Sequence, residues 1–139
     1  MRHMGAEPVS KPEQARSEAI ERYFAAIQAG DYATLSELLT SDAVTRWPQS
    51  DEVIVGAASC VMVYANYPGG SPAVQLRRLT GAGSAWIAES TADYGDDRWH
   101  VVSIFEFNGP RIASITDYFG PTLPAPDWRK PWVEREDVA

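Results

Sequence analysis

The 139-residue sequence has little cysteine and little histidine: one of the former, Cys60, and two of the latter. A single cysteine excludes a disulfide within the chain, and one cysteine with two histidines cannot complete a zinc motif. A chain without disulfides suits a reducing compartment, so we expect a cytoplasmic protein. We also expect no metal and no cofactor.

Positive charge is scarce as well, since 12 Lys and Arg face 19 Asp and Glu, a formal net charge of −7. Nucleic-acid binding needs a basic stripe on the protein, and this sequence has none. No apolar run reaches the roughly 18 residues of a membrane span. The first residues lack the apolar core of a signal peptide. We therefore expect neither a nucleic-acid partner nor a membrane partner.

Aromatic residues are plentiful, with five Trp and six Tyr in a chain whose length fits one domain. Aromatic side chains either fill a large core or line a ligand pocket. We expect a leader without order over residues 1–11, a folded domain over residues 12–121 and an extended segment over residues 122–139. That segment is expected to pack on the body or on a partner chain, anchored by Trp128 and Trp132.

Three helices are predicted in the first half of the sequence. Ile20, Tyr23, Phe24 and Ile27 recur at steps of three and four residues, which predicts a helix from Pro12 to about residue 29. A second helix over residues 31–39 follows the helix-ending Gly30. A third is predicted over residues 57–66, although its β-branched residues also fit a strand.

Strands dominate the second half. A short strand is predicted over residues 43–47, followed by a loop over residues 48–56. Four longer strand-like runs, residues 73–80, 84–94, 98–108 and 111–120, are joined by short turns, which indicates an antiparallel meander. The expected fold is α+β, with three helices on one face of a strongly curved sheet and a conical cavity between them.

Alternation along the strands predicts which side chains face that cavity. The more aromatic face of the run 98–108 is taken as the inner one. The inner face then carries Trp99, Val101, Ser103, Phe105 and Phe107, with Trp86, Ala88, Ser90 and Ala92 on one neighbouring strand and Ala113, Ile115, Asp117 and Phe119 on the other.

The outer face is predicted to be mixed in character. It carries Glu89, Asp93, His100 and Glu106, with Val102 and Ile104 among them. Asp93 and His100 are expected to lie opposite each other, as an ion pair or as contacts of an interface.

Two stretches carry a resemblance to a known family. The opening "ERYFAAIQAGDYATLSELLTSDAV" and the ending "FEFNGPRIASITDYFG" resemble the nuclear transport factor 2-like superfamily, and more narrowly its SnoaL-like branch. Relatives there include polyketide cyclases, ketosteroid isomerases and limonene epoxide hydrolases. The resemblance implies a cone-shaped α+β barrel, a hydrophobic pocket and a homodimer formed through the outer face of the sheet.

The resemblance to ketosteroid isomerases concerns four positions: it implies roles for two of them, and at the other two this sequence lacks the carboxylate of those isomerases. Tyr23 matches the tyrosine of the first helix that donates to an oxyanion, and Tyr64 matches the third-helix tyrosine that supports it. Trp47 stands where those isomerases have their general base. Ser103 stands where they have a protonated aspartate.

The resemblance to epoxide hydrolases and SnoaL-like cyclases implies a role for Asp117. It matches the last-strand aspartate of the Asp–Arg–Asp arrangement in the epoxide hydrolases and the acid/base aspartate of the cyclases. The other two hydrolase positions fall on Ser90 and Ala92, with Asp93 one residue away. Asp93 reaches the pocket only if a bulge redirects it.

The expected function is a small-molecule pocket protein that moves a proton on an apolar cyclic compound, by cyclase, isomerase or epoxide-opening chemistry. Asp117 and Tyr23 are the candidate catalytic residues. The candidate substrate-binding residues are Tyr64, Trp47, Trp86, Ser90, Ser103, Phe105 and Phe119. A carboxylate in an apolar cavity has a raised pKa, which suits acid/base work. The alternatives are a ligand-binding module without catalysis and a dimeric scaffold with a filled cavity.

Overall fold

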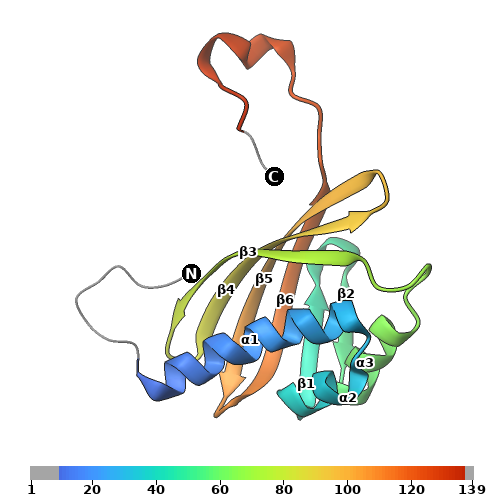
Figure 1. Ribbon diagram of the computed structural model, residues 1–139, viewed down its shortest axis with the longest axis vertical. Coiled ribbons are helices and arrows are strands. Elements are labelled where there is room, and N and C mark those ends of the chain that lie inside the picture. The colour runs from blue at the N-terminus through green and yellow to red at the C-terminus, as the bar shows by residue number, and fades with distance from the viewer. Residues whose placement is uncertain (1–9, 137–139) are drawn as a thin grey trace.

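The computed structural model describes residues 10–136 and has an α+β architecture, as the sequence predicts. Its three α-helices are α1 (Lys11–Ala29), α2 (Tyr32–Leu38) and α3 (Ala57–Ala65). All three lie on the same side of one curved sheet (Figure 1). None of the helices in the described range is long and apolar enough to cross a membrane.

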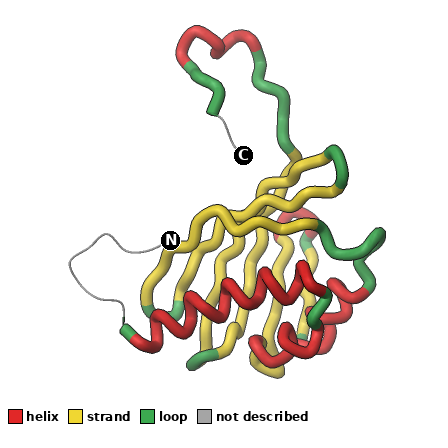
Figure 2. Tube along the Cα trace, in the orientation of Figure 1, coloured by secondary structure: helices red, strands yellow, loops and turns green. Residues whose placement is uncertain are grey.

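The sheet has six strands and stays open. They are β1 (Leu39–Trp47), β2 (Glu52–Val55), β3 (Ala73–Ala82), β4 (Ala85–Tyr94), β5 (Asp97–Asn108) and β6 (Arg111–Pro121). The order across the sheet is β2-β1-β6-β5-β4-β3, and only the β1–β6 pair is parallel. The long strands bend around α1 (Figure 2). Buried residues of the helices and of the strands form one hydrophobic core.

Helix α1 is defined at both ends by local chemistry. The Ser10 side chain accepts a hydrogen bond from the backbone N–H of Glu13, which satisfies one free donor of the first turn. Gly30 ends the helix with a φ of 69°, a left-handed conformation that glycine adopts without strain. Between these ends Ile20 and Ile27 are buried against the sheet, which confirms the predicted apolar face.

The segment after α2 differs from its prediction. The helix ends at Leu38, and Leu39 already begins β1, which is four residues longer at its start than predicted. The predicted loop over residues 48–56 is wrong, because it holds a short 3-10 helix, η1 (Pro48–Ser50), and then β2. Asp51, at a φ of 56°, makes the turn, and the β-formers of Glu52–Val55 then pair back on β1.

The start of the chain needs one small correction. Helix α1 begins at Lys11, one residue earlier than the sequence pattern indicates, with Ser10 as its cap. The rest of the predicted leader, residues 1–9, lies outside the described residues, as do residues 137–139 of the tail.

A β-bulge corrects one predicted inner residue. The β5–β6 register shifts after the Glu106–Ser114 pair, so that Phe107 pairs with Ile112 and Ala113 is the extra residue. Ile112 is fully buried, whereas Ala113 is only partly buried. Strand alternation is reversed beyond a bulge, and no turn residue marks this one in the sequence.

The outer face also differs from its prediction at two residues. Asp93 pairs with Arg98 across the β4–β5 hairpin, and the Arg98 Nε lies 3.1 Å from Asp93 Oδ1. His100 pairs with Thr91 instead, and its Nε2 lies 2.9 Å from Thr122 Oγ1. The predicted Asp93–His100 opposition is therefore wrong, because the turn is centred between Gly95 and Asp96, one residue earlier than that pairing requires.

The C-terminal segment projects away from the body (Figure 1). It contains a second 3-10 helix, η2 (Asp127–Trp132). Trp128 and Trp132 are 72% and 79% exposed, so they do not anchor the segment on the body of their own chain. The alternative, contact with a partner chain, stays a prediction.

Candidate functional site

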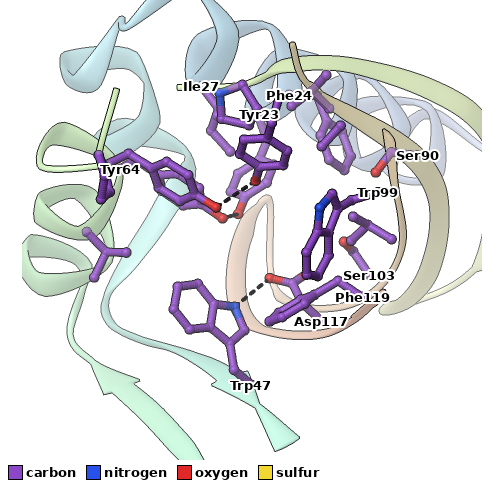
Figure 3. Close-up of a pocket in the computed structure, with 18 of the residues that line it drawn as sticks. Tyr23, Phe24, Ile27, Trp47, Tyr64, Ser90, Trp99, Ser103, Asp117 and Phe119 are labelled. Carbon is purple, nitrogen blue, oxygen red and sulfur yellow. Dashed lines mark hydrogen bonds between the residues drawn. The ribbon is translucent and has the colours of Figure 1, made fainter. Parts of the chain in front are cut away.

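A cavity of about 680 Å³ lies between helices α1 and α3 and the inner face of the sheet. This volume is within the range of small-molecule binding sites. Its walls come mainly from aromatic and aliphatic side chains (Figure 3). The large inner side chains therefore do not fill the cone, which argues against the scaffold with a filled cavity.

Asp117 points into this cavity from β6, as strand alternation predicts (Figure 3). Only 6% of its surface is exposed. The indole Nε1 of Trp47 donates a hydrogen bond of 3.0 Å to Asp117 Oδ2. Ser103 pairs with Asp117 in the β5–β6 register, and its hydroxyl also donates to the carboxylate. A carboxylate can accept about four hydrogen bonds, so it retains capacity for a bound molecule.

Burial raises the pKa of Asp117 above its ordinary value. The cause is desolvation, which disfavours the charged form of a carboxyl group. Hydrogen bonds from Ser103 and Trp47 stabilise the carboxylate and oppose this effect in part. The result is an acid whose proton is held more tightly than that of a surface aspartate.

Two tyrosines lie across the cavity from this acid. The hydroxyl oxygens of Tyr23 on α1 and Tyr64 on α3 are 3.4 Å apart, and either one can be the donor. Burial is the main cause that raises the pKa of both phenols, and the nearby Asp117 carboxylate raises them further. Both therefore stay protonated and can donate hydrogen bonds, as the pairing implied by the resemblance requires.

Aromatic rings form a continuous row around the cavity. Tyr64 stacks on Tyr67, whose hydroxyl lies 2.6 Å from that of Tyr94. Tyr94 meets the edge of Trp99 at 6.4 Å between ring centres. The row then continues through Phe119 to Trp47 on β1. Such rings give the cavity rigid apolar walls, and each ring has a partly negative face and a partly positive edge.

Most of the predicted site residues meet at this cavity. The seven that line it are Asp117, Tyr23, Tyr64, Trp47, Ser90, Ser103 and Phe119. Trp86 and Phe105 do not line it, which corrects their placement as cavity walls. Both are core residues: Trp86 donates its indole N–H to the Gly83 carbonyl at 3.0 Å, and Phe105 is fully buried.

The inner face of the sheet thus has two zones, which alternation alone does not separate. Phe105 meets the rings of Tyr23 and Phe24 edge to face, with centres 5.3 and 6.0 Å apart. It therefore packs against α1 as part of the hydrophobic core. On the same face of the sheet, Ser90, Ser103 and Asp117 line the cavity instead.

Sequence reasoning missed part of the lining. Trp99 is predicted on the inner face but is absent from the predicted site. It lies opposite Ala92 of β4, and both residues line the cavity. Tyr67 follows α3 in a loop, where no periodicity reports its direction. Tyr94 lies at the end of β4, and its contact with Tyr67 joins segments 27 residues apart.

The site holds neither a second pocket acid on β4 nor a metal cluster. Asp93 is turned to the outer face with Arg98, so no bulge redirects it into the cavity. Over residues 10–136, no group of three or more His, Cys, Asp or Glu side chains is arranged to hold a metal ion. The lining of the cavity offers the buried Asp117 carboxyl, the exposed Asp97 carboxyl, the Asn66 amide, several hydroxyls and aromatic rings.

Solved structures with the same fold were found by comparison. An NTF-2 like protein of unknown function from Burkholderia xenovorans LB400 is 31% identical, with a TM-score of 0.84 over 92% of this chain and 100% of that one. A protein from Kribbella flavida DSM 17836, provisionally described as a ketosteroid isomerase, is 25% identical, with a TM-score of 0.81 over 93% and 94% of the two chains.

A more distant neighbour is an LEH-like epoxide hydrolase from M. tuberculosis, 26% identical with a TM-score of 0.66 over 77% of this chain and 84% of that one. No curated protein matches the chain. The family described as the SnoaL-like domain matches residues 20–115, which is more than half of the sequence. This protein belongs to the SnoaL-like domain family and has the NTF2-like fold.

Proposed function

We propose that this protein binds an apolar cyclic compound in its cavity and moves a proton on it, with Asp117 as the acid/base. The observation that carries the proposal is the buried Asp117 carboxyl, held by Trp47 inside an apolar cavity of about 680 Å³. Structural similarity to an epoxide hydrolase and to a provisional ketosteroid isomerase supports small-molecule chemistry in this fold.

The proposed step is proton abstraction from carbon next to a carbonyl group. Asp117 takes the proton, the C–H electrons form a carbon–carbon double bond, and the carbonyl electron pair moves to oxygen. The Tyr23 hydroxyl, supported by Tyr64, donates a hydrogen bond to that oxygen as it gains negative charge. Return of the proton to the same or another carbon restores Asp117.

The experiment uses 2-tetralone, a bicyclic ketone with acidic C–H groups, in deuterated water. Exchange of these hydrogens for deuterium is followed by NMR, and no natural substrate is required. We expect the wild type to accelerate exchange and Asp117→Asn to lose about 100-fold or more of that rate, the usual share of a general base. Tyr23→Phe should lose about 100-fold, since it removes one donor to the oxyanion.

Tyr118→Phe is the matched control. Tyr118 follows Asp117 on β6 but is 46% exposed on the outer face, so its exchange rate should equal that of the wild type. Equal rates for the wild type and Asp117→Asn would remove Asp117 from proton transfer. Binding of 2-tetralone without any exchange in the wild type would favour the alternative of a ligand-binding module.

A further inference from the structure

The charge of the cavity lining differs from what a purely apolar ligand requires. Among the described residues that line it, Asp117 and Asp97 are acids and none is lysine, arginine or histidine. Asp117 lies deep in the cavity, whereas Asp97 is exposed at the start of β5. A ligand that enters therefore meets negative charge at the mouth and again inside.

Aromatic rings surround the inner acid on several sides. Trp47 and Phe119 are 6.0 Å apart with an angle of 86° between their planes, and Trp99 is tilted 53° from Phe119 at 6.2 Å. Rings at such angles form the walls of a corner. Figure 3 shows the Asp117 carboxyl between these rings, facing the open space.

Such a corner matches the chemistry that recognises organic cations. The faces of Trp, Tyr and Phe attract a positive nitrogen through the ring quadrupole, and Trp does so most strongly. A cation loses its hydration in an apolar cavity, which is costly unless a counter-charge replaces the water. The Asp117 carboxylate provides that counter-charge, while an anion there meets like charge without a basic partner.

We propose that the cavity selects an organic cation, an apolar body carrying one amine or quaternary ammonium nitrogen, which lies between Asp117 and the rings of Trp47, Trp99 and Phe119. This proposal names the class of ligand for the cavity described under the proposed function. It rests on that function only in that both use the same cavity. Asp97 attracts the same cation at the mouth, an effect that salt screens.

Three probes with one hydrocarbon body and different charge test the selection. They are 1-aminoadamantane, which is a cation at neutral pH, 1-adamantanol, which is neutral, and adamantane-1-carboxylate. Binding to the full chain is measured by calorimetry and by tryptophan fluorescence. We expect the amine to bind about tenfold more tightly than the alcohol, and the carboxylate most weakly.

Variants then locate the preference. Asp117→Asn should lower the affinity for the amine about tenfold and leave that for the alcohol nearly unchanged. Trp99→Leu keeps an apolar wall without a ring face, so it should weaken the amine more than the alcohol. Asp96→Asn makes the same charge change in the turn between β4 and β5, outside the lining, and should alter neither affinity.

Two results would overturn the proposal: an alcohol that binds the wild type as tightly as the amine, or an amine preference that survives in Asp117→Asn. Absence of binding by all three probes would overturn it as well. These binding measurements do not depend on whether the protein catalyses hydrogen exchange of 2-tetralone. If Asp117 proves necessary for 2-tetralone exchange while the alcohol binds best, the proposed ligand class is wrong and the proposed function stands. If the amine binds best through Asp117 while Asp117→Asn exchanges 2-tetralone as fast as the wild type, the ligand class stands and the proposed function is wrong.

Discussion

The indole of Trp47 donates a 3.0 Å hydrogen bond to the carboxylate of Asp117, and this contact joins the two parallel strands of the sheet. Thr45 and Arg46 pair with Ile115 and Thr116, so the next residues of both strands lie side by side at the cavity. A tryptophan at this position therefore acts on the pocket acid directly. It stabilises the charged carboxylate and forms a wall beside it.

Trp47→Phe should move the working pH of Asp117 upward. The change removes a hydrogen bond that favours the carboxylate, so the pKa of Asp117 rises further above its ordinary value. The acid limb of the 2-tetralone exchange profile should shift to higher pH, and the free energy of unfolding should fall by about 1–3 kcal/mol. Trp99→Phe is the control, since it shortens a cavity indole that does not donate to Asp117; an equal shift there would contradict this role of Trp47.

Asp117→Asn should stabilise the protein at neutral pH while it removes activity. Because burial raises the pKa of Asp117, the fold favours its protonated form. The stability that the protonated Asp117 contributes is fully present below the pKa of 3.8 that the carboxyl has in the unfolded chain. It is lost as the pH rises through the raised pKa of Asp117 in the folded protein. A neutral amide avoids the loss and can still accept from Trp47.

Urea unfolding at several pH values measures this effect. The variant should be about 0.5–2 kcal/mol more stable at neutral pH, and the difference should shrink as the pH falls toward 3.8. Asp96→Asn, an exposed acid, should show little change. A variant less stable than the wild type at neutral pH would mean that the carboxylate supports the fold.

The helices and the antiparallel meander could be predicted from local patterns in the sequence. The three- and four-residue spacing of Ile20, Tyr23 and Ile27 marks the buried face of α1, and Gly30 marks its end. Alternation placed Ser103 and Asp117 on the inner face, where they pair across β5 and β6. These features depend on neighbours close in the sequence, so they could be predicted.

Other features depend on contacts between distant segments and could not be predicted. The bulge at Ala113 reverses the alternation without any local signal, and β2 is held by its pairing with β1. Trp86 and Phe105 share the inner face with the cavity residues, and only the position of α1 over them decides that they are core. The Trp47–Asp117 contact joins residues 70 positions apart.

Gly81→Ala should be strongly destabilising, because β3 and β4 approach closely there. A Cβ atom at this position would lie 2.6 Å from the Ala85 carbonyl oxygen and 2.7 Å from the Trp86 ring. We expect a loss of about 1–3 kcal/mol in the free energy of unfolding, the usual cost of overpacking. Gly120→Ala on β6 is the matched control, with no atom near its Cβ. Equal stability of the two variants would contradict the close approach.

We propose that two copies pair through an apolar patch on the outer face of the sheet. Ile87 lies opposite Ile104, and Val102 lies opposite Tyr118, so the four side chains are adjacent. Three of them, Ile87, Val102 and Tyr118, are 39–46% exposed. Val102→Glu should convert a dimer to a monomer in size-exclusion chromatography with light scattering. Gln28→Glu, on the exposed side of α1, is the control for added negative charge. A monomeric wild type would refute the pairing.

The titration of Asp117 tests the central claim most directly. The carboxyl ¹³C resonance of Asp117, assigned by its loss in Asp117→Asn, is followed by NMR as a function of pH. The account predicts a pKa clearly above the ordinary value of 3.8, moved further upward in Trp47→Phe. A carboxyl that titrates at or below 3.8 would show that Asp117 is a solvated or ion-paired acid, and the cavity would lose its proton-transfer group.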